Sequence, residues 1–223
     1  TFDINTACAG FVTALDIARK FLAADAQYTH ALVIGAYAMS RFLDLDDKKT
    51  ATLFADGAGA VVLRAEAGDG PGLGPCKLHT DGQYHGWMGI YAGGAARPIT
   101  PERLAAREHT VKFVHKFPVS VNPDTWTRLI GELCEAQGIT PLDIDRYVFT
   151  QLNINSIHET LTRLGVPTER GHTVMQQLGY TGSACIPMAF DDAVRSGAVG
   201  PGDRVAFVAS GGGLAFAAML ATL

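Results

Sequence analysis

Apolar residues follow two different spacings along this chain. Short apolar runs alternate with longer segments in which apolar residues recur every three or four positions. The short runs predict buried strands, the longer segments predict amphipathic helices, and their alternation is typical of an α/β fold. Strands are expected at residues 2–5, 30–36, 58–65, 74–80, 146–150, 204–209 and 214–221. Helices are expected at residues 10–24, 118–137, 155–164 and 182–196.

The first predicted helix begins directly after a cysteine. Phe11 and Leu15 lie on its apolar face, and Cys8 stands where the preceding strand would meet its first turn. The N–H groups and positive end of a helix favour a thiolate, and can lower a thiol pKa from about 8.5 to roughly 3.5–7.5. The small neighbours Ala9 and Gly10 leave room for a substrate. Cys8 is therefore the candidate nucleophile, and a buried structural cysteine is the alternative.

Composition narrows the classes of protein to which the chain can belong. Its 223 residues are 48% hydrophobic, enough to bury a sizeable core. A net charge of −4 without a basic cluster argues against a nucleic-acid partner. No apolar run reaches the roughly 20 residues that span a bilayer, which argues against a membrane-bound protein. Four widely spaced cysteines suggest neither a zinc site nor a disulfide framework, so we expect a reducing, cytoplasmic location.

The pattern divides the chain into two parts. Residues 1–101 and 102–223 each contain a strand–helix–strand pattern, and a Gly- and Ala-rich loop is expected at residues 81–101. Long loops in compact domains are frequently functional. The chain begins at Thr1 with a segment that reads as an interior strand, so we expect it to be part of a longer polypeptide that is not stable without its upstream segment.

Four segments, in order, resemble the β-ketoacyl-acyl-carrier-protein synthase III group of the thiolase superfamily. They are Asp3-Ile4-Asn5-Thr6-Ala7-Cys8-Ala9-Gly10-Phe11, Phe54-Ala55-Asp56-Gly57-Ala58-Gly59-Ala60, Gly179-Tyr180-Thr181-Gly182-Ser183-Ala184-Cys185-Ile186-Pro187 and Ser210-Gly211-Gly212-Gly213-Leu214. The resemblance implies a thiolase-like α/β fold, layered αβαβα, with two similar halves of which the N-terminal one is incomplete here. It also implies a homodimer or heterodimer, and about a third of a usual family member upstream of residue 1.

The resemblance assigns roles to the cysteine and to a glycine run. Cys8 would accept an acyl group from an acyl-CoA or an acyl carrier protein as a thioester, with no permanently bound cofactor and no metal. The N–H of Cys8 and the run Gly211, Gly212 and Gly213 would form the oxyanion site, because glycines let a backbone approach a reacting carbonyl. A strand-to-strand turn is the alternative reading of the glycines.

The sequence departs from this family at the second half of the site. The family's His and Asn in one segment align with Gln151 and Ile154, and a second Asn aligns with Tyr180. Those groups stabilise the enolate that forms when a malonyl thioester loses carbon dioxide, and removing one donor typically costs about 2.7–4 kcal/mol of barrier. We therefore expect decarboxylative condensation to be crippled and acyl transfer to Cys8 to survive. Gln151 and Tyr180 could still donate neutral hydrogen bonds.

Other polar residues are possible substitutes for the missing groups. His85, His158 and His172 could supply an imidazole, although a solvated or structural role is favoured for each. Asn153 could turn toward the gap, although Asn at a helix start is typically a cap. Asn155 is open to the same two readings.

Two further positions concern the substrate. Lys48 aligns near the family's CoA-binding basic residue and is a candidate phosphate contact, with a solvated loop charge as the alternative. Ser210 stands where a bulky Phe often precedes the glycines, which would widen the site.

The leading hypothesis is an acyltransferase of the ketoacyl synthase III type, acting in fatty-acid or secondary-metabolite biosynthesis. It would load an acyl chain on Cys8 and pass it to an acceptor. The alternatives are a non-catalytic partner subunit of a heteromeric ketosynthase, and a conventional 3-oxoacyl-acyl-carrier-protein synthase that uses Gln151. Cys185, at the start of another predicted helix, is the only rival nucleophile.

Overall fold

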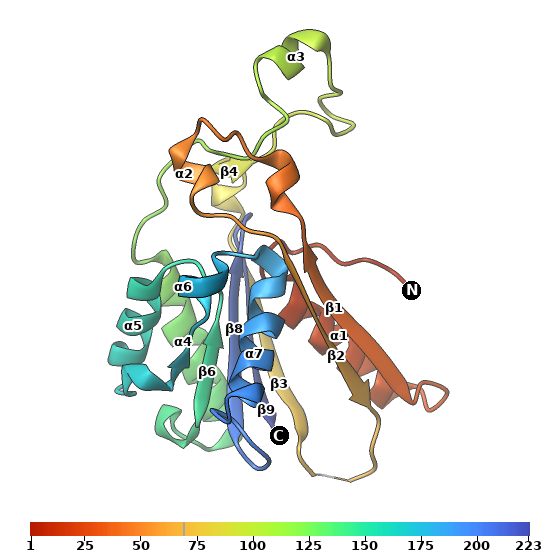
Figure 1. Cartoon of the computed structure of the whole chain (residues 1–223). Helices are drawn as coiled ribbons and strands as arrows, with labels where there is room; N and C mark the ends of the chain where they lie inside the picture. Colours follow the sequence, from red (N-terminus) through yellow and green to blue (C-terminus); the bar gives the residue numbers. More distant parts are fainter. Residues whose placement is uncertain (69) are drawn as a thin grey trace.

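A computed structural model describes residues 1–68 and 70–223 of the chain. Its main body has four layers, in the order helices, five-stranded sheet, helices, two-stranded sheet (Figure 1). The four long helices are the predicted ones, and their bounds are α1 Gly10–Ala24, α4 Val121–Gln137, α5 Ile154–Arg163 and α7 Cys185–Arg195. Within the described part of the chain, no helix is long and apolar enough to cross a membrane.

The five-stranded sheet is the centre of the molecule. Its spatial order is β3 (Gly72–Thr80), β9 (Ala215–Thr222), β8 (Arg204–Gly211), β6 (Arg146–Phe149) and β7 (Gly171–His172). β6 runs parallel to β7 and β8, and β9 is antiparallel to both of its neighbours. α4 and α5 cover one face of this sheet, and α1 and α7 cover the other. Strands buried on both faces explain the continuous apolar runs in the sequence.

The two-stranded sheet lies on the far side of α1 and α7. Strands β1 (His30–Tyr37) and β2 (Gly57–Arg64) are antiparallel, and their residues alternate between a face turned to these helices and an outer face. The outer face exposes Leu32, Ile34 and Val62. The alternation of more buried and more exposed residues along these strands therefore follows from one covered face and one exposed face.

Burial of one face and two ion pairs of Asp16 stabilise α1. Its apolar face is buried in the core, and Asp16 on its other side is buried as well. Lys20 donates to this carboxylate at 2.6 Å and Arg19 at 2.8 Å. Although burial alone would raise the pKa of Asp16, these two cations hold it below its usual value.

An arm projects from one end of the body (Figure 1). It contains β4 (Met88–Gly89), α3 (Pro101–Ala105) and β5 (Lys112–Phe113), and β4 pairs with β5. Val111 N–H donates to Phe42 O at 2.8 Å, which ties the arm to the segment that follows β1. The remaining short helices are α2 (Lys48–Ala51) and α6 (Met175–Leu178). The expected loop at residues 81–101 is thus partly ordered into β4 and leads into α3.

One sequence-based expectation about the fold is wrong. Residues 2–5 form no strand, and Phe2 is exposed, because no described segment pairs with them. The other six predicted strands are present. The division at residue 101 stays a prediction, and β3, which precedes that residue, pairs with β9 in the five-stranded sheet.

Candidate active site

Cys8 occupies a tight turn at the start of α1. Ala9 N–H donates to Thr6 O at 3.1 Å, and Gly10 N–H donates to Ala7 O at 2.9 Å. Ala7 adopts a φ of 48°, which an L-residue rarely takes and which is typical of functional turns. The turn places Cys8 directly before the helix, as the sequence predicts, and buries it to 4% exposure.

The burial of Cys8 controls its protonation. Burial raises the pKa of Cys8 to about 11, although the Tyr180 hydroxyl and the cysteine's own N–H act to lower it. Burial therefore opposes the thiolate that the helix terminus is expected to favour, and the thiolate at neutral pH stays a prediction.

Gly211, at the end of β8, brings a second strand against this turn. A Cβ at Gly211 would lie 2.5 Å from Thr6 O and 2.7 Å from Cys8 N, so only glycine fits there. Gly212 is less confined, since its Cβ would meet only the flexible end of Met88 at 3.0 Å. Gly213 has a φ of 138° and does not line the cavity described next.

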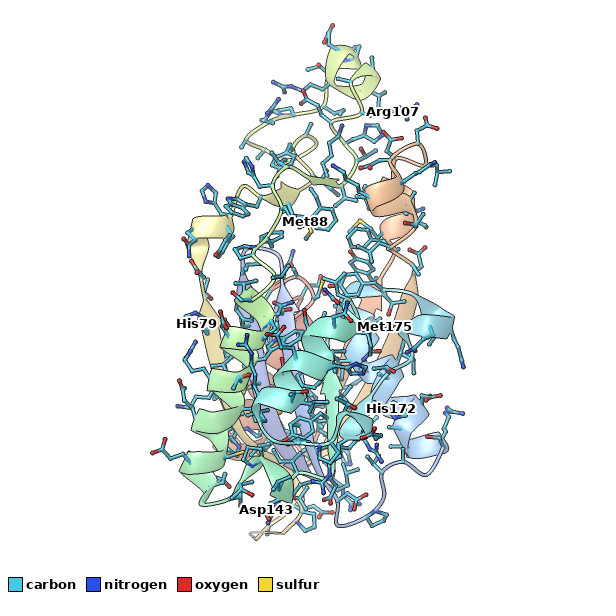
Figure 2. All side chains as sticks on the ribbon, turned by 90° about the vertical axis from the view of Figure 1, so that its left-hand side faces the viewer. His79, Met88, Arg107, Asp143, His172 and Met175 are labelled. Atoms are coloured by element: carbon cyan, nitrogen blue, oxygen red, sulfur yellow. The ribbon has the colours of Figure 1, made fainter. Side chains whose placement is uncertain are left out.

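A cavity of about 350 Å³ opens beside Gly211, between the arm and the body. Figure 2 shows Met88, one of its lining residues, at the base of the arm facing the body. Most of the lining is apolar: Leu53, Phe54, Met88, Phe113, Phe117, Pro118, Val119, Val121, Leu152, Leu214 and the glycines 211 and 212. The polar lining residues are Lys116, Asn122, Asn153, Ser156, Tyr180 and Ser210. This size and character are typical of a small-molecule site.

Tyr180 connects the cavity to the thiol. It lines the cavity, and its hydroxyl lies close enough to the Cys8 sulfur to lower the pKa of that thiol. Its ring packs against Phe54 with centroids 5.5 Å apart. Burial raises the pKa of Tyr180 well above its usual value, so the hydroxyl stays protonated and can donate to sulfur.

Gln151 is held away from the cavity by three hydrogen bonds. Its Nε2 donates to Phe149 O at 2.9 Å and to His172 O at 3.1 Å, and its Oε1 accepts from Val174 N–H at 2.9 Å. Both amide hydrogens are used, so none is left for a substrate. The expectation that Gln151 replaces the family's imidazole as a donor does not fit this geometry. The residue instead fastens the end of β6 to the segment that leads into α6.

Cys185 shares the buried surroundings of Cys8, and neither cysteine lines the cavity. Its Sγ accepts from Gln151 N–H at 3.5 Å, and burial raises its pKa. Ile154, the first residue of α5, also lies outside the lining. Asn153 lines the cavity and caps α5, with Oδ1 accepting from Asn155 N–H at 3.0 Å.

The three candidate histidines have other partners or lie in solvent. His172 Nε2 lies 2.7 Å from Asp192 Oδ2, away from the arm in Figure 2. His85 Nδ1 lies 3.0 Å from Gly82 O, and His158 is exposed on α5. None of them is among the residues that line the cavity. Within the described residues, no cluster of His, Cys, Asp and Glu could hold a metal ion.

The basic residue at the cavity is not the expected one. Lys48 is exposed in α2 and does not line the cavity, whereas Lys116 does. Lys116 follows β5 without any local periodicity, so only the fold of the arm brings it to the site. Ser210 lines the cavity as expected, and its N–H donates to Thr150 Oγ1 at 2.9 Å.

Comparison with known families accounts for this combination of turn, glycines and cavity. The model of 3-oxoacyl-[acyl-carrier-protein (ACP)] synthase III matches residues 2–82, and that of its C-terminal region matches residues 134–223. The chain belongs to the 3-oxoacyl-[acyl-carrier-protein] synthase III family.

Individual relatives support this family assignment. The β-ketoacyl-[acyl-carrier-protein] synthase III of Rhizorhabdus wittichii is 36% identical over 217 residues, which are 97% of this chain and 65% of the relative. The solved synthase III from Thermus thermophilus is 29% identical, with a TM-score of 0.87 over 100% of this chain and 67% of its own. The priming β-ketosynthase from the R1128 polyketide biosynthetic pathway is 28% identical, with a TM-score of 0.82 over 100% and 65%. The fold is therefore the thiolase-like α/β fold of this family, and the chain spans about two thirds of these relatives' lengths.

Proposed function

We propose that this protein is an acyltransferase of the synthase III type that carries its acyl group as a thioester on Cys8. The observation that supports this most directly is the placement of Cys8, which is buried beside Gly211, a residue that lines the apolar cavity. The donor is an acyl-CoA or an acyl carrier protein, as in the family. The acceptor belongs to fatty-acid or secondary-metabolite biosynthesis.

The transfer step needs only groups that this chain supplies. Cys8 Sγ attacks the thioester carbonyl as a thiolate, the S–C bond to the carrier breaks, and the carrier thiolate takes up the proton that Cys8 lost. The Tyr180 hydroxyl donates to the Cys8 sulfur and stabilises its negative charge. The N–H of Cys8 and the backbone of Gly211 and Gly212 are the proposed contacts of the oxyanion.

Decarboxylative condensation is expected to be weak. By the resemblance, Gln151 stands at the position of the family's imidazole, and its amide is fully used, while Ile154 has no polar group to offer. Of the three positions that align with the family's His and Asn residues, Tyr180 alone lines the cavity. This geometry argues against the alternative of a conventional synthase that uses Gln151.

A second candidate is a partner subunit that performs no acyl transfer. The observation that favours it is the shielding of Cys8, which is buried and has a raised pKa. Such a subunit would pair with an intact synthase as a heterodimer, whereas the acyltransferase would form a homodimer or heterodimer in which each site acts. Residues 1–101 would contribute the nucleophile half and residues 102–223 the C-terminal half, completed by an upstream segment.

The test measures the two half-reactions separately. The protein is incubated with a panel of acyl-CoAs and acyl carrier proteins and weighed intact, with Cys8→Ser as the control. In parallel, carbon dioxide release from a malonyl thioester is measured. The acyltransferase predicts a Cys8-dependent acyl adduct with little carbon dioxide. Absence of any adduct would support the partner subunit. Rapid release of carbon dioxide would support the conventional synthase.

A further inference from the structure

The thiol of Cys8 and the cavity are neighbours without being connected. Cys8 is 4% exposed and is not one of the residues that line the cavity. Two lining residues touch its surroundings, namely Gly211 through its backbone and Tyr180 through its hydroxyl. Gly211 has no side chain, so among the described residues Tyr180 is the one whose side chain both lines the cavity and acts on the thiol.

The main chain of Tyr180 is fixed on both sides. Its carbonyl accepts from Ala55 N–H at 2.9 Å, and its own N–H donates to Leu53 O at 3.2 Å. The ring of Tyr37 fills the space beside Gly182, since a Cβ added at Gly182 would lie 2.4 Å from that ring. A shift of this backbone would break several contacts at once. The ring can therefore leave the thiol only by side-chain rotation, and the free volume beside it is the cavity.

We propose that the side chain of Tyr180 is a gate between the cavity and Cys8, and that it limits the size of the acyl group the thiol accepts. In the closed position the Tyr180 ring covers the Cys8 sulfur, and the Tyr180 hydroxyl interacts with that sulfur. In the open position the ring occupies part of the cavity, so the ring and the incoming thioester compete for the same space. Short acyl groups are then favoured over long ones. This inference rests on the proposed acylation of Cys8.

Alkylation tests the gate without any acyl transfer. Cys8 is labelled with iodoacetamide and with a bulky maleimide, and the ratio of the two rate constants is taken, because the thiolate fraction cancels in it. Tyr180→Ala should raise the bulky-to-small ratio by about tenfold or more, equivalent to about 1.4 kcal/mol of barrier. Tyr180→Phe keeps the ring and should leave the ratio unchanged. Val194→Ala, at an exposed position of α7 outside the cavity lining, is the control.

Two results would overturn the gate. One is an equal ratio in wild type and Tyr180→Ala, and the other is a gain in Tyr180→Phe as large as that in Tyr180→Ala. Cys134 lies in the core on the other face of the sheet and should stay unlabelled in every folded variant. If Tyr180→Ala exposes Cys134, the single-site variant Tyr180→Leu, which keeps more bulk in the site, replaces it and should give an intermediate ratio.

A second measurement addresses the acyl group itself. Intact mass compares loading from acetyl-CoA and decanoyl-CoA, and Tyr180→Ala should shift loading toward the decanoyl group while Val194→Ala should not. An unchanged preference in Tyr180→Ala would overturn the limit on acyl size. Failure of the proposed function would give a different set of results. The alkylation ratio would still rise in Tyr180→Ala and stay unchanged in Tyr180→Phe, but neither acyl-CoA would load Cys8 in any variant.

Discussion

The starts of α1 and α7 look alike in the sequence and differ in the structure. Each helix of the middle layer begins beside a buried cysteine that follows an alanine, Cys8 at α1 and Cys185 at α7. Neither cysteine lines the cavity, but Cys8 lies against two residues that do, Gly211 and the gate residue Tyr180. Cys185 is held by the N–H of Gln151, which lies outside the lining. A helix N-terminus therefore does not by itself make a nucleophile, because access decides which thiol can react.

The strongest test of this comparison removes each thiol in turn. Cys8→Ser should lower acyl loading by about a thousandfold or more, because the attacking atom is lost. Cys185→Ser should leave loading nearly unchanged. Intact mass after incubation with an acyl-CoA measures both variants. Comparable losses in the two would mean that both thiols belong to one reacting unit, and the distinction drawn between the two helices would fail.

The next test concerns the residue that holds Cys185. Gln151→Leu removes an amide that satisfies the buried carbonyls of Phe149 and His172 and the N–H of Val174. Unsatisfied buried groups cost about 1–3 kcal/mol each, so we expect a loss of about 2–5 kcal/mol in the free energy of unfolding. Denaturant unfolding measures it, and the exposed Gln137→Leu is the matched control. An unchanged free energy of unfolding would mean that these hydrogen bonds contribute little, so that the Gln151 amide would be free to contact a substrate.

Regular elements follow from the sequence, whereas the contacts that decide chemistry do not. The apolar spacing of residues 10–24 predicts α1 with its observed bounds, because that pattern is local. The raised pKa of Cys8 depends on how deeply the whole fold buries it, and no local pattern reports that. The same holds for Lys116, which the arm brings to the cavity, and for Gln151, whose partners include the distant His172 and Val174.

Pairing between distant strands also escapes the local pattern. The segment that forms β3 reads correctly as a strand, yet its partner β9 lies at the other end of the chain. Residues 2–5 have the composition of a strand but no partner among the described residues. The motifs around Cys8, Tyr180 and Gly211 were recognisable as a set because the family resemblance places them together, not because their spacing does.

A third test uses the close approach of β8 to the turn at Cys8. Gly211→Ala places a Cβ 2.5 Å from Thr6 O and 2.7 Å from Cys8 N, both of them backbone atoms that must move. A displacement of this kind is expected to lower acyl loading by about 10²-fold. Gly212→Ala meets only the end of Met88 at 3.0 Å and is the matched control with a mild effect. If the two variants load equally, contact between β8 and the nucleophile turn is not required.

The smallest effect expected is the change in the reactivity of Cys8 for each pH unit. Because burial raises the pKa of Cys8 to about 11, its thiolate fraction should grow by about tenfold for each pH unit from 7 to 10. The rate of alkylation by iodoacetamide should rise in the same proportion. The raised pKa also means that the folded state holds this proton more tightly than the unfolded chain, so this contribution to stability is complete below about pH 8.5 and is lost as pH rises toward 11.

Tyr180→Phe removes a hydrogen bond that lowers the pKa of Cys8, so its rate profile should move to still higher pH. A profile that levels off near neutral pH in the wild type would show that the thiolate is already formed there. The helix N-terminus would then outweigh burial, and the difference between the resting states of α1 and α7 would have to come from charge rather than access.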